Sequence, residues 1–194
     1  MTLSARFGEA LAYAFELHAN QHRKGSDVPY VAHLLSVAAL VLEHGGSEDE
    51  AIAALLHDAV EDQGGAATSQ AIDQRFGPEV AAIVEGCSDA TGMPKPPWRE
   101  RKESFVTRLA TARPAVHLVC AADKLHNARS LVDDYREQGE ELWQRFSGGR
   151  TGTLWYYRAV AEALAGATCQ RLVRELTRAV NELEHMASRA SDDA

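Results

Sequence analysis

The stretch AALLHDAVED, from Ala53 to Asp62, carries an apolar run directly into one histidine and three carboxylates. Its alanines and leucines are typical of a buried helix, whereas ionisable groups at the edge of an apolar interior need a partner of opposite charge. In a helix, residues four apart lie nearly above one another, so we expect His57 beside Glu61 and Asp58 beside Asp62. A metal ion would supply the missing positive charge at this end of the helix.

Two residues elsewhere in the chain could complete a metal site. His33 lies near the start of an apolar helical segment, and Asp123 lies within the apolar stretch LVCAADKLHN. Taken singly, the first could be a core histidine and the second a buried ion-pair partner. A set of two imidazoles and two carboxylates favours Mn, Fe or Zn over the all-oxygen sites that suit Mg or Ca. Four protein ligands would leave positions for water and substrate on an octahedral ion, so we predict a metal site formed by His33, His57, Asp58 and Asp123.

The remainder of the chain has helical spacing of apolar residues, broken by glycine and proline, with no strand-like alternation. Ser47 with Glu50 forms a capping box, and Pro78 and Pro114 suit the first turns of helices. The sequence therefore predicts an all-α fold in one compact domain over 1–190, followed by a disordered tail, 191–194. The predicted helices cover 4–20, 31–43, 47–63, 68–76, 78–87, 100–111, 114–135, 154–165 and 171–186.

Composition excludes several classes of protein. The chain has 194 residues and a formal net charge of −8, which disfavours generic nucleic-acid binding because that needs a basic surface. No apolar run is long enough to span a membrane, and the N-terminus lacks the pattern of a secretion signal. The cysteines, Cys87, Cys120 and Cys169, are scattered and odd in number, which indicates reduced thiols and a cytoplasmic protein. Nothing in the sequence indicates an oligomeric state.

The pattern H…HD…D, formed by His33, His57–Asp58 and Asp123, resembles the signature of the HD-domain metal phosphohydrolases. Within them, the chain is most similar to the hydrolase domain of the RelA/SpoT family, which removes the 3′-pyrophosphate of the alarmone (p)ppGpp. The similarity covers about 5–131, and the short chain resembles the small alarmone hydrolases, including metazoan SpoT homologues, rather than bifunctional members. Four segments carry it: HRKGSDVPYVAHLLSVA, AALLHDAVED, FGPEVAAIVEGCSD and AADKLHNARSL.

This resemblance implies a role for each matching residue. The four H…HD…D residues would hold one Mn²⁺, and Glu61 and Asp62 would position or activate the attacking water. Arg23 and Lys24 would contact the nucleotide, and Asn127 would lie near the ribose and the scissile phosphate. We then expect hydroxide to attack the phosphorus nearest the 3′-oxygen and release pyrophosphate, with Glu61 or Asp62 as general base.

Several positions depart from the family pattern or allow two interpretations. Gln63 stands where threonine is common in the family. Trp98 could stack on a base or fill the core beneath a loop. The basic residues around it could form a phosphate clamp or a solvated helix end: Lys95, Arg99, Arg101 and Lys102. The segment 154–160 is expected to pack on the core, although some of its side chains could reach the nucleotide: Tyr156, Tyr157 or Arg158.

The other histidines are expected to be surface or packing residues: His18, His22, His44, His117 and His185. His126 stays open, because it falls within the helix of Asp123 but off that residue's face.

Two alternative functions remain. The same site could serve another nucleotide phosphohydrolase, acting on (p)ppApp, the 2′-phosphate of NADPH or a nucleoside 5′-monophosphate. A binding module that senses a nucleotide without cleaving it is the alternative from a different class. Such a module should have lost a ligand or an acid, whereas all four ligands, Glu61 and Asp62 are present.

Overall fold

The computed structural model describes residues 2–89 and 95–192. Throughout these ranges the regular structure is helical, apart from an isolated β-bridge between His22 and Pro29, so the all-α prediction is confirmed. In chain order the helices are α1 (Ala5–Leu17), α2 (Val31–Glu43), α3 (Glu48–Leu56), α4 (Ala59–Asp62), α5 (Ala66–Phe76), α6 (Pro78–Cys87), α7 (Trp98–Leu109), α8 (Pro114–Gln138), the 3₁₀ helix η1 (Gly139–Arg145), α9 (Gly149–Ala163) and α10 (Gln170–Asp192).

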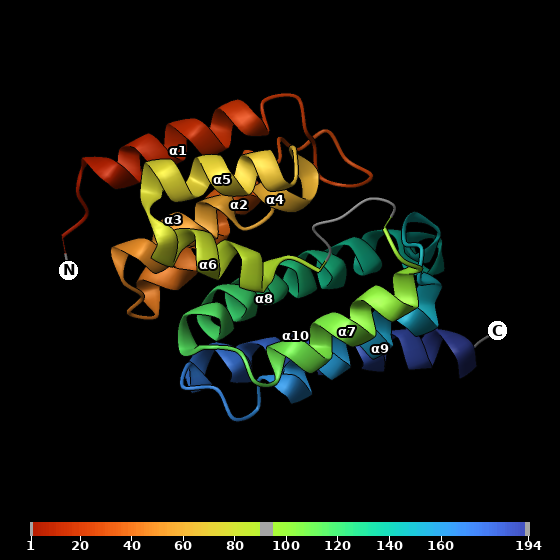
Figure 1. Ribbon diagram of the computed structural model, residues 1–194. Coiled ribbons are helices and arrows are strands. Elements are labelled where there is room, and N and C mark those ends of the chain that lie inside the picture. Colours follow the sequence, from red (N-terminus) through yellow and green to blue (C-terminus); the bar gives the residue numbers. More distant parts are fainter. Residues whose placement is uncertain (1, 90–94, 193–194) are drawn as a thin grey trace.

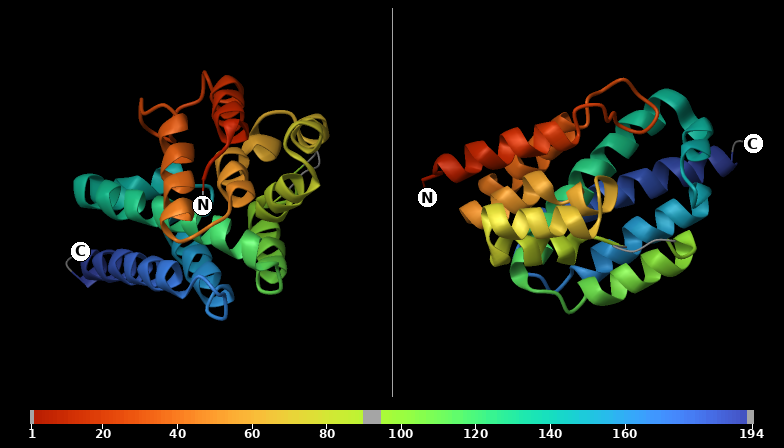
Figure 2. Two further views of the ribbon diagram at one scale, coloured as in Figure 1. Left: turned by 90° about the vertical axis from the view of Figure 1, so that its left-hand side faces the viewer. Right: turned by 45° about the horizontal axis from the view of Figure 1, so that its top comes forward.

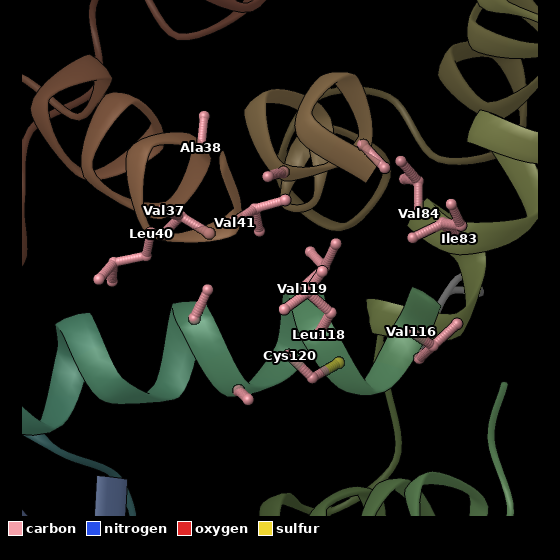
Figure 3. Packing of buried hydrophobic residues seen from close by; sticks show 14 of the residues in the cluster. Val37, Ala38, Leu40, Val41, Ile83, Val84, Val116, Leu118, Val119 and Cys120 are labelled. Carbon is pink, nitrogen blue, oxygen red and sulfur yellow. The ribbon is translucent and has the colours of Figure 1, made fainter. Parts of the chain in front are cut away.

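Helix α8 forms the centre of the molecule. It packs against α2, α3 and α6 on one side and against α9, α10 and η1 on the other. Figures 1 and 2 show α1 and α10 on opposite sides of it. Apolar side chains fill the contact, and Figure 3 shows Val119 of α8 pointing toward Val41 of α2. Both of these valines are fully buried, so the helix that carries Asp123 is fixed by core packing.

Local signals set where several helices begin. The Ser47 side chain accepts from the backbone N–H of Glu50, whose carboxylate accepts in return from the backbone N–H of Ser47, so the predicted capping box is present. Pro78 and Pro114 occupy first turns, where the missing N–H is not needed.

The helix of the HD motif differs from the prediction. It ends at Leu56, and a new short helix, α4, begins only at Ala59. On a regular helix, the neighbours His57 and Asp58 would point about 100° apart. The backbone of Asp58 opens to φ −97° and ψ −5°, and the His57 Nε2 and Asp58 Oδ2 atoms come within 3.0 Å of each other. The break therefore turns two consecutive side chains toward one point.

The ends of several other helices also differ from those predicted from the sequence. Helix α7 begins at Trp98 rather than 100, α9 begins at Gly149 rather than 154, and η1 was not predicted. Helix α10 continues to Asp192, and so includes part of the stretch predicted as a tail; 193–194 lie outside the described residues. Among the described helices, none is both long and apolar enough to cross a membrane, and the cytoplasmic location stays a prediction.

The two interpretations of Trp98 can now be separated. Its ring packs against Trp155 and Tyr156 of α9, with centroid distances of 6.4 Å to each. A Cβ added to Gly148 would lie 2.6 Å from this ring. Trp98 therefore fills the space between α7 and the start of α9.

We expect Gly148→Ala to lower the free energy of unfolding by about 1–3 kcal/mol, because the added methyl group overpacks Trp98. Gly166→Ala is the matched control, since nothing lies within 4 Å of the Cβ that it would add. Urea denaturation measures both. In a Trp98→Leu background the cost of Gly148→Ala should fall, and an unchanged cost would contradict the steric explanation.

Candidate active site

Three helices bring the predicted metal ligands together. His33 comes from the first turn of α2, His57 and Asp58 from the break between α3 and α4, and Asp123 from the middle of α8. The His33 and His57 side chains are buried, and Asp123 is only 5% exposed. The sequence separation is large, so core packing alone decides that these groups meet.

The polar atoms of the cluster face one another closely. One ligand atom each of His33, His57 and Asp58 lies within 4.8 Å of the others. Asp123 Oδ1 lies 3.3 Å from His33 Nε2 and 3.6 Å from His57 Nε2. All four residues that the H…HD…D pattern selected therefore lie in one cluster, with Asp123 against the two imidazoles.

Hydrogen bonds on the far side of each ring orient the imidazoles. His57 Nδ1 lies 2.8 Å from the backbone carbonyl of Ala54, and His33 Nδ1 lies 2.8 Å from His126 Nδ1. Both Nε2 atoms are buried, and neither makes a hydrogen bond of good geometry within the described ranges, although each lies within 4 Å of both carboxylates. A buried nitrogen without a partner is costly, and a metal ion is the partner that such a pair fits. The donor set therefore suits a divalent cation, and His126, which the sequence left open, supports His33 from behind.

The ionisable groups of the cluster have pKa values that are shifted in different directions. Burial alone would lower the pKa of His57, but Asp58 and Asp123 raise it well above its ordinary value. Burial dominates at His33 and lowers its pKa despite its contact with Asp123. Burial would raise the pKa of Asp123, yet Lys124 and the two imidazoles bring it well below the ordinary range. Burial would also raise the pKa of Asp58, but the His57 imidazole brings it below the ordinary range. Both carboxylates are thus held ionised, as metal ligands must be.

Neighbouring side chains support the two carboxylates. The Tyr30 hydroxyl donates to Asp58 Oδ2 at 2.5 Å, and Asn127 Nδ2 donates to Asp123 Oδ1 at 2.5 Å. Lys124 Nζ lies 2.6 Å from Asp123 Oδ2. Sequence reasoning placed Asn127 on the face of Asp123, but it missed Tyr30 and Lys124, whose roles depend on tertiary contacts.

Glu61 and Asp62 leave α4 in different directions. Glu61 faces α7 and the residues just before it, with Arg101 Nη1 of α7 3.7 Å and Lys95 Nζ 3.2 Å from its Oε1 atom. Burial and the nearby Asp89 carboxylate raise the pKa of Glu61 in spite of Lys95 and Lys102, which lower it. A carboxylate with a raised pKa accepts a proton more readily near neutral pH, which is the property of a general base.

Asp62 is held from the side of α1. Its Oδ2 accepts from Gln21 Nε2 at 2.8 Å. The Gln21 Oε1 atom lies 2.7 Å from His18 Nδ1 and 2.6 Å from Gln63 Nε2. Two neighbours thus contact the oxygen of the Gln21 amide, which leaves its NH₂ group for Asp62. His18 is buried as expected of a packing residue, but its part in this network was missed.

A cavity of about 550 Å³ opens from the cluster. Both acids of α4 line it, together with Arg23, Lys24 and Asn127, so every predicted catalytic and substrate-binding residue borders the same space. Arg23 Nη2 donates to Asn127 Oδ1 at 2.7 Å, which ties the loop before α2 to α8.

The basic residues for which a phosphate clamp and a solvated helix end were both considered have different positions in the structure. Lys102 lines the cavity beside Lys124, and its Nζ lies 2.5 Å from the buried carboxylate of Asp89. Arg99 instead pairs with Glu103 and lies over the Trp155 ring, so it belongs to the surface of α7. In the 154–160 segment, Tyr157 lines the cavity, Tyr156 is buried near Lys102, and Arg158 pairs with Glu184 away from the site.

Residues 10–154 match the family described as HD domain. The chain belongs to the HD-domain family. This match covers α2, α3, α4 and α8, and so includes every element that supplies a group to the cluster.

Several proteins that resemble the chain have names that state an enzymatic activity. It is 40% identical over 126 residues to guanosine-3′,5′-bis(diphosphate) 3′-pyrophosphohydrolase MESH1 of Xenopus tropicalis, covering 63% of this chain and 68% of that protein. The Drosophila melanogaster MESH1 is 36% identical over 131 residues, covering 66% of this chain and 70% of that protein. A solved structure, described as a metazoan orthologue of SpoT that hydrolyses ppGpp, superposes with a TM-score of 0.75 at 28% identity and covers 92% of this chain and 97% of that one. The predicted resemblance to small alarmone hydrolases is confirmed.

We expect Mn²⁺ to raise the melting temperature of the metal-stripped HD-domain protein, because a ligand of the folded state stabilises it by mass action. At a hundredfold excess over Kd the gain is about 2.7 kcal/mol, or roughly 5–10 °C. Asp58→Asn should remove most of this rise, whereas His185→Ala, on the exposed side of α10, should keep it. Differential scanning calorimetry measures both, and a full rise in Asp58→Asn would exclude Asp58 as a ligand.

Proposed function

We propose that this protein hydrolyses the 3′-pyrophosphate of guanosine alarmones, converting (p)ppGpp to GDP or GTP plus pyrophosphate. The observation that carries the proposal is the pair of buried Nε2 atoms that face two carboxylates beside Glu61 and Asp62. The names of the MESH1 relatives and of the solved structure support the same reaction.

His33, His57, Asp58 and Asp123 would hold one divalent cation, for which we propose Mn²⁺, with Fe or Zn as alternatives for the same mixed donor set. When bound, such an ion supplies Lewis-acid activation of water and of a phosphoryl oxygen. The chain's own contribution is to keep both carboxylates ionised and to turn both Nε2 atoms toward them.

The two acids of α4 would orient the attacking water and accept its proton. Glu61 takes a proton from the attacking water, and its raised pKa makes it a suitable acceptor. Asp62, fixed by Gln21, orients that water or acts as the base in its place. The new bond forms between the water oxygen and the phosphorus nearest the 3′-oxygen, and the bond from that phosphorus to the 3′-oxygen breaks. The 3′-oxygen takes up a proton from solvent or from protonated Glu61, and the nucleotide and pyrophosphate leave.

Cations around the cavity would bind the phosphates. Lys102 and Lys124 border the space on the α7 and α8 sides, and Arg23 and Lys24 border it on the loop before α2. Cations in a partly buried cavity offset the charge of a pyrophosphate group more strongly than cations in bulk water. The net charge of the chain is −8, so this local gathering, rather than a basic surface, would select a small phosphorylated substrate.

We expect metal-stripped protein to release GDP and pyrophosphate from ppGpp only after Mn²⁺ is added, as measured by ion-exchange chromatography. In parallel reactions, ppApp and NADPH test the alternative substrates. Glu61→Gln should keep the Mn²⁺-induced melting shift and lose roughly 10²–10⁴ in rate, because a general base contributes about that factor.

Each other outcome changes a different part of the proposal. Cleavage of ppApp or NADPH alone would keep the chemistry and replace the substrate. Bound metal without cleavage of any nucleotide would favour the sensing module. Full turnover in Glu61→Gln, with loss in Asp62→Asn, would transfer the role of general base to Asp62.

We also expect Lys95→Met to move the acidic limb of the kcat/KM profile to higher pH. Lys95 lowers the pKa of Glu61, so its removal raises that pKa and the base is deprotonated only at higher pH. The shift should be roughly 0.2–0.7 pH unit, the size expected for a partly exposed ion pair. Arg99→Met is the control, since Arg99 pairs with Glu103 instead. If the acidic limb of the profile does not shift, ionisation of Glu61 does not determine that limb.

A further inference from the structure

The cavity continues along α8 well beyond the metal ligands. Asp123, Asn127, Leu131 and Asp134 all line it, at intervals of four, four and three residues that keep them on one face of the helix. At 1.5 Å per residue, Asp134 lies about 16 Å along the axis from Asp123. A nucleotide that places its 3′-phosphates at the cluster would extend its base toward this far end.

An aromatic ring borders the far end. Phe146 follows η1 and lines the same cavity, with the Nζ atom of Lys24 lying 5.2 Å from its ring centroid. Phosphate and ribose gain little from a phenyl ring, whereas a purine gains by stacking on one. The ring therefore indicates where the base would lie.

A carboxylate lines the same cavity, and the arginine that precedes Phe146 in the chain holds it in one orientation. Asp134 Oδ2 accepts from Arg145 Nη1 at 3.2 Å. Arg145 also donates to Gln138 and passes so close to Gly25 that an added Cβ would lie 2.6 Å from its Nε. The side chain of Asp134 is 40% exposed, and its Oδ1 atom makes no hydrogen bond within the described parts of the chain. An accessible acceptor, positioned by a fixed arginine, thus borders the cavity.

We propose that Asp134 selects guanine over adenine, with Phe146 as the stacking surface; this rests on the proposed function and names the base that its site takes. The Watson–Crick edge of guanine carries two adjacent donors, N1–H and the 2-amino group, and an ionised carboxylate is an acceptor only. Adenine presents a lone pair at N1 instead, which repels a carboxylate. Asp134→Asn replaces one acceptor by a donor, so the variant matches adenine as well as it matches guanine.

Equilibrium binding tests the inference without requiring hydrolysis. We would titrate metal-stripped protein with GDP, IDP and ADP by isothermal calorimetry, because IDP lacks only the 2-amino group. The wild type should bind GDP roughly tenfold or more tightly than ADP, with IDP between them, as expected for one or two hydrogen bonds to a charged acceptor. Asp134→Asn should reduce the GDP to ADP ratio to within about twofold. Asp133→Asn is the matched control, because Asp133 is exposed and pairs with Arg136.

Phe146 provides a second variant. Phe146→Ala should weaken GDP and ADP alike, by about five- to a hundredfold, because stacking does not distinguish the bases. Circular dichroism confirms that each variant is folded.

The outcomes separate the two proposals. A wild type with no preference for GDP, or with no measurable binding of any of the three nucleotides, overturns the inference. So does a preference that survives Asp134→Asn or that is lost equally in Asp133→Asn. If the preference follows Asp134 but ppGpp is not cleaved, the base selection stands and the proposed hydrolysis fails.

Discussion

The structure depends on placing two buried imidazoles, one buried carboxylate, Asp123, and one partly buried carboxylate, Asp58, at the edge of an apolar helical core. Such groups are costly in that setting unless each one is paired. Here Lys124, Tyr30 and Asn127 contact the carboxylates, and a backbone carbonyl and His126 orient the rings. The Nε2 atoms of both rings face the two carboxylates without a hydrogen bond of good geometry in the described structure, an arrangement that a cation held between them would complete. The packing of α2, α3 and α8 thus removes these polar groups from water, which costs free energy. The same packing also places their partners where they offset that cost.

The break between α3 and α4 separates the residues that would bind the metal ion from the acids that would accept the proton. His57 and Asp58 turn inward at the break, while Glu61 and Asp62, in the short helix α4 that follows, have different neighbours. Burial raises the pKa of both acids, but Glu61 lies among the charges of Asp89 and Lys95, whereas Asp62 accepts a hydrogen bond from the neutral amide of Gln21. Two adjacent acids therefore differ in environment, which allows them different roles in one reaction.

Much of this could be predicted from the sequence, because it is encoded locally. The capping box, the prolines at first turns and the H…HD…D pattern gave the helices and all four clustered residues. The break at His57 was missed because helical periodicity describes regular backbone only. Trp98 could not be decided, since its partner Gly148 lies fifty residues away in the chain. The place of Asp134 in the cavity could not be predicted, because it depends on η1 folding back so that Arg145 contacts Asp134 and Phe146 lines the same cavity.

The wide spacing of the clustered residues has a consequence for folding. His33 and Asp123 are ninety residues apart, so their meeting closes a long loop and depends on the docking of α8 on α2. An unfolded or half-assembled chain offers only the adjacent pair His57–Asp58, which is too few donors for tight chelation. The affinity for a cation therefore depends on whether α8 has docked on α2. The fraction of molecules in a preparation that do not bind metal would measure the fraction of misfolded chains.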